Sequence, residues 1–328
     1  MASLRETATA ELSPEAVVDQ RVMKLLSNIE RVIFGKREVI KLCVTGLLAR
    51  GHLLIEDVPG MGKTTLAQGL ARSIEGTFHR VQFTSDMLPS DILGVSILNQ
   101  RTQEFEFRPG PIFANVVLAD EVNRTPPKTQ SALLEAMSEF QVSVDGATRT
   151  LPNPFIVLAT QNPIEYEGTY TLPESQLDRF MLRVEMGYPG NDDELHIMRR
   201  RDPRTDLDQL KPVLTSRDVM DLQALTGKVM VEESVARYIL AIIQGTRNHE
   251  FIQLGASPRA SVSFYEACQA RALVEGRDYV TPDDVRQMAV PLLSHRVLVK
   301  SRDGNPIASA RARARVIYEI VQQTPCPE

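Results

Sequence analysis

The chain has 328 residues, of which 24% are charged and 43% are hydrophobic, and this ordinary globular composition excludes disorder and collagen-like repetition. The length suits two domains better than one. The net charge of −5 disfavours a strongly basic surface, so nucleic acid is not the expected partner, although a local basic patch is compatible with this balance.

Residues 1–15 are predicted to form a flexible N-terminal tail. They include acidic residues and lack the apolar segment of a secretory signal. No apolar run in the sequence approaches the roughly 20 residues of a membrane helix, so membrane insertion is not expected and the cytoplasm is the predicted location. The cysteines and histidines are scattered without CxxC or metal-ligand spacing, which predicts neither a disulfide framework nor a zinc site.

Residues 16–188 are predicted to alternate between helices and short apolar strands. Ser13 and Pro14 are typical of a helix start, and a second helix is expected between Gly35 and Gly51. Further helices are expected at 64–74 and 128–140, strands at 53–55, 81–83, 115–119 and 155–159, and a hairpin at 141–151. Strands that are apolar on both faces and alternate with helices predict an α/β fold with a parallel sheet covered by helices.

The pattern after residue 189 changes to helices only, at 191–201, 216–226, 232–246, 258–274 and 282–293. Thr281 followed by Pro282 and two aspartates is a clear helix start, since the acids favour the positive end of the helix dipole. Residues 190–300 are therefore predicted to form a small all-helical domain. Residues 301–328 are predicted to add a C-terminal helix and a tail.

A phosphate-binding loop is predicted between the first strand and the next helix, from Asp57 to Thr65. The glycines let successive backbone N–H groups point inward, and the helix start adds further free donors. Asp57 stands where the motif usually has glycine, and the alternative is a chance glycine turn before a helix. The predicted nucleotide contacts are Pro59, Gly60, Met61, Gly62, Lys63, Thr64 and Thr65, with Lys63 reaching the phosphates and Thr64 binding Mg²⁺.

Paired carboxylates follow the predicted strand at 115–119. We expect Asp120 to hold Mg²⁺ through the water shell of the ion, with the Thr64 hydroxyl as a further ligand, and Glu121 to orient and activate the attacking water. Helix capping is the alternative for an isolated Asp-Glu pair.

The strand at 155–159 leads to Asn162, whose amide is expected beside the γ phosphate. Taken alone, an asparagine before Pro163 is more typical of a turn.

Four segments together resemble the MoxR family of AAA+ ATPases: residues 57–65, 120–124, 159–163 and 177–180. The resemblance covers roughly residues 25–300. It implies an AAA+ P-loop NTPase fold, with a five-stranded parallel sheet and flanking helices, followed by a small helical lid domain. It also implies an insertion in the second helix at about 84–114, which projects with the hairpin at 141–151 toward the pore or partner face of a ring.

The resemblance also implies roles for three polar residues. Asn162 matches the first sensor, and Arg179 matches the arginine finger that acts on the γ phosphate of the neighbouring subunit. Arg259 matches the second sensor, which the lid holds near the nucleotide. The alternatives are that Arg179 pairs with Asp178 or caps a helix, and that Arg259 is a surface residue.

The resemblance also bears on the segment before the second helix and on the residue that follows the carboxylate pair by three positions. Phe34 and Gly35 lie in a segment that resembles the one packing on adenine in such enzymes. Arg124 is compatible with a contact across a subunit interface and equally with a surface salt bridge.

The sequence shows no second catalytic set, so ATP hydrolysis with Mg²⁺ is predicted to drive a conformational change in a partner protein. The resemblance implies self-association, as a hexameric ring, and a partner that carries a von Willebrand A domain or another client protein. The alternatives are a DNA-directed motor or clamp-loader-like switch, and a structural ring that holds ATP without hydrolysing it.

Overall fold

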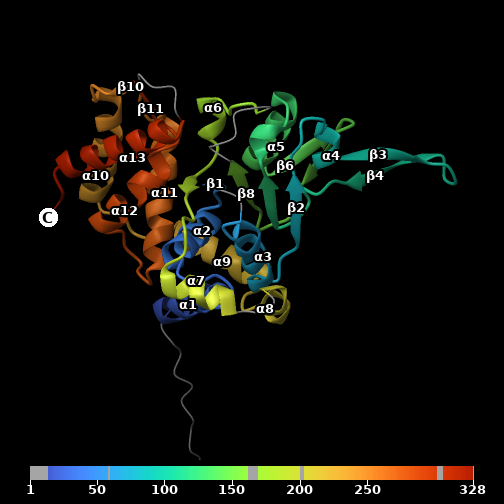
Figure 1. Ribbon diagram of the computed structural model, residues 1–328, viewed down its shortest axis with the longest axis horizontal. Helices are drawn as coiled ribbons and strands as arrows, with labels where there is room; N and C mark the ends of the chain where they lie inside the picture. Colours follow the sequence, from blue (N-terminus) through green and yellow to red (C-terminus); the bar gives the residue numbers. More distant parts are fainter. Residues whose placement is uncertain (1–13, 58–59, 162–168, 200–202, 301–305, 328) are drawn as a thin grey trace, which may run out of the picture.

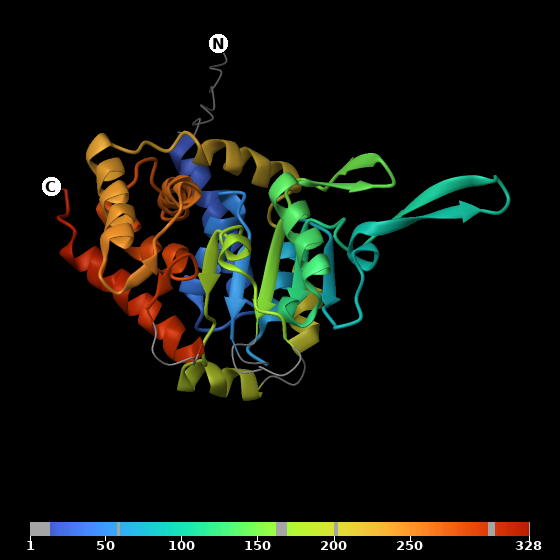
Figure 2. The same cartoon turned by 90° about the horizontal axis from the view of Figure 1, so that it is seen from above.

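Five parallel strands form the centre of the computed structural model, which describes residues 14–57, 60–161, 169–199, 203–300 and 306–327 (Figures 1 and 2). The order across the sheet is β2-β5-β8-β1-β9, and every neighbouring pair is parallel. The strands are β1 (Leu53–Glu56), β2 (Phe78–Gln82), β5 (Val116–Asp120), β8 (Ile156–Gln161) and β9 (Leu182–Val184). The predicted parallel sheet is confirmed, and β9 is the strand that the residue pattern did not locate.

Side chains of each central strand alternate between two buried apolar clusters. Leu53 and Ile55 of β1 belong to one cluster and Leu54 to the other. In β5, Leu118 belongs to the first cluster and Ala119 to the second. Burial on both faces explains why these strands are continuous apolar runs rather than alternating ones.

Helices cover both faces of the sheet (Figure 2). On one face, the first cluster joins the sheet to α1 (Pro14–Glu30), α2 (Arg37–Leu48) and α3 (Lys63–Ser73). The same cluster continues into α9 (Ser216–Thr226), α10 (Glu233–Asn248), α11 (Pro258–Val274), α12 (Pro282–Leu293) and α13 (Pro306–Gln323). On the other face, α5 (Pro127–Glu139) packs in the second cluster. The short helices are α4 (Pro89–Leu93), η1 (Val122–Arg124), α6 (Glu174–Leu177), α7 (Asn191–Arg199) and α8 (Pro203–Gln209).

The prediction that residues 190–300 contain helices only is wrong. Strands β10 (Ile252–Leu254) and β11 (Leu298–Val299) pair in an antiparallel two-stranded sheet beside α10 and α13. Segments of two and three residues carry no recognisable period, so this pairing comes from tertiary contact alone.

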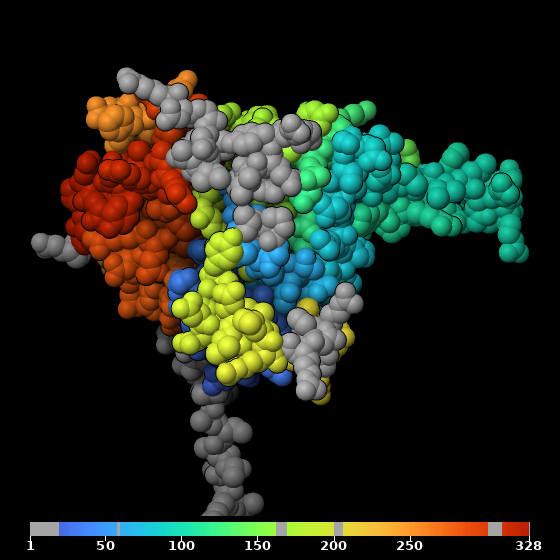
Figure 3. Space-filling view, viewed as in Figure 1, coloured from blue at the N-terminus to red at the C-terminus, as the bar shows by residue number. Residues whose placement is uncertain are grey.

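Two hairpins extend from the core between the sheet strands. The longer one, β3 (Gly94–Asn99) with β4 (Glu104–Pro109), stands clear of the body in Figure 3. The shorter one pairs β6 (Gln141–Val144) with β7 (Ala147–Thr150), as the Asp-Gly turn predicted. Phe105 of the longer hairpin is 74% exposed. Within the described ranges, no helix combines the length and the apolar character needed to cross a membrane.

A buried histidine joins the sheet to α5. The Nδ1 atom of His52 accepts from the Val157 N–H at 3.0 Å, so Nε2 carries the proton and donates to the Met137 carbonyl at 2.9 Å. Burial lowers the pKa of His52 to about 4, and the nearby Arg259 lowers the pKa further while the Met137 hydrogen bond opposes the shift. The imidazole is therefore neutral at physiological pH.

Candidate functional site

The phosphate loop connects β1 to α3 at the carboxyl edge of the sheet. Gly62 is the N-cap of α3 and has φ +86°, a left-handed conformation that glycine adopts without penalty. The first turn of α3 contains no acidic residue that could take up its free N–H groups. The Nζ atom of Lys63 donates to the Asp57 carbonyl at 3.0 Å. The first N–H groups of α3 have no partner within the helix, so the helix start can bind an anion. The predicted contact at Pro59 lies outside the described residues.

Asp57 replaces the usual first glycine of the motif, and the structure gives a reason. Its Oδ2 atom accepts from the Gly187 N–H at 2.6 Å, which ties the loop to the chain that leaves β9. One residue earlier, Glu56 pairs with the buried Arg183 at 2.7 Å. Arg183 also binds Glu185 at 2.6 Å. The start of the loop is thus anchored to β9 and the residues that follow it.

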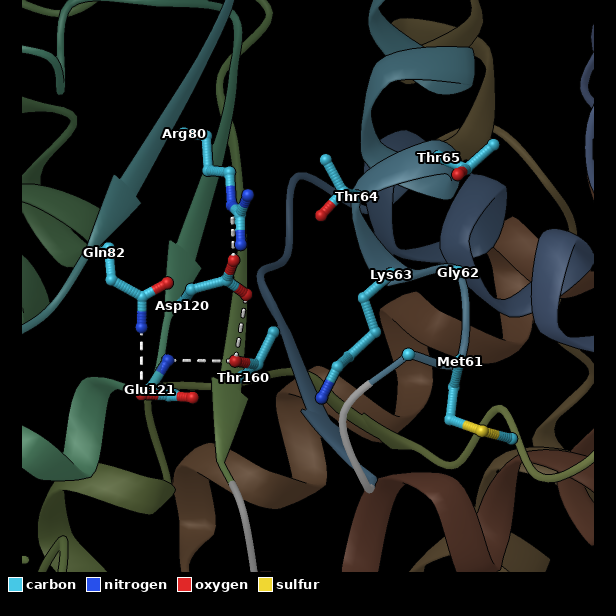
Figure 4. A pocket seen from close by; sticks show the side chains of 11 residues that line it. Met61, Gly62, Lys63, Thr64, Thr65, Arg80, Gln82, Asp120, Glu121 and Thr160 are labelled. Atoms are coloured by element: carbon cyan, nitrogen blue, oxygen red, sulfur yellow. Dashed lines mark hydrogen bonds and ion pairs between the residues drawn. The ribbon is translucent and has the colours of Figure 1, made fainter. Parts of the chain in front are cut away.

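The carboxylate pair lies at the end of β5. Asp120 is buried, and its Oδ1 accepts from the Thr160 hydroxyl at 3.1 Å while its Oδ2 accepts from the Arg80 Nε at 2.6 Å. The Thr160 Oγ1 also accepts from the Glu121 N–H at 2.9 Å. One hydroxyl on β8 therefore positions both Asp120, the last residue of β5, and Glu121, which follows it (Figure 4).

Glu121 is held in an unusual conformation by polar neighbours. Its φ of +59° lies in the left-handed region, which is uncommon for a residue with a side chain and often marks a functional site. Its Oε2 atom accepts from the Gln82 amide at 2.9 Å and lies 2.9 Å from the Arg124 Nε. Arg124 therefore forms an ion pair with Glu121 within the chain. The sequence left open a subunit contact or a surface salt bridge for this residue.

These residues line a polar cavity of about 300 Å³ at the carboxyl edge (Figure 4). Lys63 and Thr64 lie across the cavity from Asp120 and Glu121 in Figure 4. Burial lowers the pKa of Lys63, and the carboxylates of Asp120, Asp57 and Glu121 oppose that shift. The lining residues are Gly60, Met61, Gly62, Lys63, Thr64, Thr65, Arg80, Gln82, Asp120, Glu121 and Thr160.

A second, mostly apolar cavity of about 270 Å³ adjoins the first. The two share Gly60, Met61, Gly62 and Thr65 of the phosphate loop. The other lining residues are Val32, Ile33, Phe34, Lys36, Met186, Gly187, Pro189 and Ile197. A charged half joined to an apolar half matches the polarity of a nucleotide, with its phosphates and its base.

Gly35 does not line either cavity, but a side chain at its position would be strained and crowded. Its φ is +65°, and a Cβ atom there would lie 1.9 Å from the Asp193 Oδ2. The neighbouring Phe34 ring lies 5.7 Å from the His196 ring of α7. Gly35 thus allows α7 to approach the apolar cavity.

The donor set suits Mg²⁺ on chemical grounds. Thr64 and Asp120 present a hydroxyl and a carboxylate to the polar cavity, and Mg²⁺ prefers oxygen ligands, usually one or two carboxylates together with waters and substrate phosphates. Among the described residues, no cluster of three or more His, Cys, Asp or Glu could hold a metal by itself. A metal at this site would therefore depend on the nucleotide for its remaining ligands.

Arg179 does not reach this cavity. It lies in the turn before β9, at the amino edge of the sheet, where the Met181 N–H donates to the His52 carbonyl just before β1. Its Nη1 donates to the Leu134 carbonyl at 2.7 Å and to the Ser138 hydroxyl at 3.0 Å. The guanidinium therefore rests against α5, at the edge opposite the phosphate loop.

Arg259 also lies at the amino edge, which corrects the expectation that the lid holds it near the nucleotide of its own chain. It is exposed in the first turn of α11, two residues after the N-cap Ser257. The Ser257 hydroxyl donates to the Asp178 Oδ2 at 2.9 Å, in the same turn as Arg179. The reason is the packing of α11 against α1 and α2, which sets the start of α11 away from the phosphate loop.

A buried arginine fixes this amino-edge turn. Arg296 binds the Asp178 carboxylate at 2.9 Å and donates to the carbonyls of Phe180 and Met181 at 2.8 and 3.2 Å. Burial lowers its pKa to about 10, although the Asp178 carboxylate raises it, so the guanidinium is charged at neutral pH. Arg296 thus connects the helical region to the turn that carries Arg179.

Sequence reasoning missed three residues of the polar cavity: Arg80, Gln82 and Thr160. Arg80 and Gln82 are two apart on β2 and therefore share one face of the strand, which was a visible signal. The sequence does not show that β2 lies beside β5, so it could not show that Arg80 and Gln82 contact Asp120 and Glu121. The expected sensor Asn162 lies outside the described residues.

Comparison with known proteins agrees with this geometry. Residues 52–182 match the family model "ATPase family associated with various cellular activities (AAA)", and residues 244–317 match an AAA lid domain. The uncharacterized protein YeaC of Bacillus subtilis is 52% identical, covering 91% of this chain and 93% of its own. Chaperone MoxR1 of Mycobacterium tuberculosis is 40% identical, covering 93% of this chain and 82% of its own.

A solved structure shares the whole architecture. The crystal structure of a candidate ATPase from Cytophaga hutchinsonii superposes with a TM-score of 0.86 and is 36% identical, covering 96% of this chain and 97% of its own. The extent of these matches, together with the phosphate loop and carboxylate pair described above, assigns the family. The chain belongs to the MoxR family of AAA+ ATPases.

Proposed function

We propose that this chain binds ATP with Mg²⁺ and hydrolyses it at an interface between subunits. The observation that carries the proposal is the pair of adjoining cavities that share the phosphate loop, one polar with two carboxylates and one apolar. In this proposal the base lies against Phe34 and its neighbours. The phosphates lie on the α3 start, with Lys63 as their counter-charge.

The two carboxylates take different roles in this proposal. Asp120 and Thr64 hold Mg²⁺, which supplies positive charge to the phosphates when it is bound. Glu121 accepts a proton from the attacking water. The Glu121 carboxylate is oriented by Gln82 and Arg124, and its backbone by Thr160. Asn162 is proposed to position the water or sense the γ phosphate.

Arg179 is proposed to act on the nucleotide of a neighbouring copy. Its place at the amino edge separates it from the phosphate loop of its own chain, so a contact with nucleotide requires a second copy. Arg259 lies on the same edge, and the same requirement applies to it. We therefore propose a closed ring, with six subunits as the expected number, in which the amino edge of one chain faces the carboxyl edge of the next.

The energy of hydrolysis is proposed to remodel, assemble or activate a partner protein. The name Chaperone MoxR1 given to a 40% identical relative supports this output. The expected partner carries a von Willebrand A domain, or is another client protein, and the exposed β3–β4 hairpin is a suitable surface for contact. Three unpaired cysteines, Cys43, Cys268 and Cys326, are compatible with the reducing cytoplasm as its location.

Phosphate release by the purified protein tests the proposal. Glu121→Gln should bind ATP and turn it over at least about 100-fold more slowly, the lower range for loss of an acid–base group. Arg179→Ala should keep nucleotide affinity and lose turnover, and mixing it with Lys63→Ala subunits should restore part of the activity. Equal background rates in wild type and Glu121→Gln would instead favour a ring that holds ATP without hydrolysis, and stimulation by DNA would favour a DNA-directed motor.

A further inference from the structure

Arg80 forms an ion pair with Asp120, the carboxylate proposed to bind the metal, from a neighbouring strand. It lies on β2, the edge strand of the sheet, opposite Leu118 of β5. Its Nε donates to the Asp120 Oδ2 at 2.6 Å, and its side chain is 51% exposed while that of Asp120 is 9% exposed. In Figure 4 the guanidinium reaches down from β2 to the carboxylate, facing the start of α3.

The contact places a positive charge on an oxygen that a metal would also need. The Asp120 Oδ1 already accepts from Thr160, so Arg80 engages the remaining carboxylate oxygen. A guanidinium and a divalent cation repel each other, and both gain from the same carboxylate. Pairing of Asp120 with Arg80 and binding of Mg²⁺ at Asp120 are therefore competing states.

Arg80 also sets the charge balance of the cavity. Among the lining residues, Lys63 and Arg80 offset Asp120 and Glu121, so the lining is neutral overall. Glu121 also pairs with Arg124, which lies outside the lining, so Asp120 is the carboxylate that Arg80 neutralises. Without Arg80, a triphosphate that enters without metal would meet the Asp120 carboxylate without this counter-ion, whereas a triphosphate with Mg²⁺ would bring its own positive charge.

We propose that Arg80 acts as the internal counter-ion of Asp120, which lets the site accept nucleotide before Mg²⁺ and which the metal replaces at the carboxylate. This proposal rests on the proposed function, because it assumes that nucleotide and Mg²⁺ bind in this cavity. Arg80 is a positioning residue in this account, since it acts through Asp120. The competing explanation is a structural ion pair between the half-exposed Arg80 and the buried Asp120, without a role in nucleotide binding.

The test measures the dissociation constant of a fluorescent non-hydrolysable ATP analogue for wild type and Arg80→Ala, once in EDTA and once in saturating Mg²⁺. We expect Arg80→Ala to weaken binding in EDTA by about fivefold to tenfold, as expected for one lost charge pair. In Mg²⁺ the affinity should stay equal or increase, because the metal no longer has to displace a guanidinium. The ratio of the two constants should therefore rise about fivefold or more, and Arg80→Lys should restore most of the EDTA affinity.

Arg72→Ala is the matched control. Arg72 forms a more exposed pair with Asp208 at 2.8 Å, also donates to the Leu207 carbonyl, and does not line the cavity, so this variant should leave both constants unchanged. Equal weakening in EDTA and in Mg²⁺ would show that Arg80 is only structural or is a direct phosphate ligand, and would overturn the proposal. Wild type that binds no nucleotide under either condition would instead overturn the proposed function itself.

Discussion

Thr160 is the residue whose removal should most directly test how the carboxylate pair is held. It is buried in β8, and its single hydroxyl donates to the Asp120 Oδ1 and accepts from the Glu121 N–H. Thr160→Val keeps the branched shape of the side chain and removes both contacts. It therefore separates the effect of the hydroxyl from the effect of packing.

The size of the effect follows from the two lost hydrogen bonds. A hydrogen bond to a charged acceptor contributes about 1.5–3 kcal/mol, and a partly buried N–H without a partner costs about 1–3 kcal/mol. We expect Thr160→Val to lower the free energy of unfolding by about 2–4 kcal/mol, given that such contributions are not fully additive. We also expect a fall in the turnover number of about 10- to 100-fold, part of the 10²–10⁴ that a positioned acid–base group contributes.

Urea unfolding midpoints and steady-state phosphate release measure these two effects. Thr160→Ser is the control, because it keeps the hydroxyl and loses one methyl group, which costs about 1 kcal/mol. It should keep most of the turnover. Wild-type turnover together with a wild-type midpoint in Thr160→Val would refute the argument that this hydroxyl positions Asp120 and Glu121.

Three further outcomes are expected. The folded-state pKa of His52, about 4, lies below the ordinary histidine pKa of 6.5, so the unfolded chain binds more protons between these values. The free energy of unfolding should therefore fall by about 3 kcal/mol as the pH drops from 6.5 to 4, and His52→Gln should flatten this part of a urea-midpoint profile against pH. Arg296→Met should destabilise the fold by about 3–5 kcal/mol, measured by urea unfolding, because it leaves the Asp178 carboxylate unpaired, and adding Asp178→Asn should recover part of the loss. Gly62→Ala should weaken nucleotide binding in a fluorescence titration, because the φ of +86° at this position strains a residue with a Cβ by about 1–2 kcal/mol. Gly146→Ala is the control: at φ +75° in the β6–β7 turn, it should carry similar strain without changing the nucleotide affinity.

Much of the architecture could be predicted because its determinants are local. The central strands are buried on both faces and so read as short apolar runs, and the helices begin at cap residues or prolines such as Ser257 and Pro282. The hairpin at 141–151 follows from its Asp-Gly turn. The phosphate loop is equally local, since a strand, a glycine turn and a helix start are contiguous in the chain.

Other features were decided only by contacts between distant segments. Strand β9 is three residues long and is defined by its pairing with β1, and β10 and β11 pair across more than forty residues. Arg259 was expected beside the nucleotide, but α11 packs so that its first turn meets Asp178 at the opposite edge of the sheet. Neither result follows from the period or composition of the segment involved.

The sequence by itself determined the chemistry of the site: a glycine-rich turn before Lys63 and Thr64, and two carboxylates after an apolar strand, are short-range patterns whose purpose can be read from residue type. Only the tertiary structure decided which polar groups surround them. Arg80, Gln82 and Thr160 become partners of Asp120 and Glu121 because β2 and β8 lie on either side of β5, and that order depends on the burial of whole strands and helices rather than on any local motif.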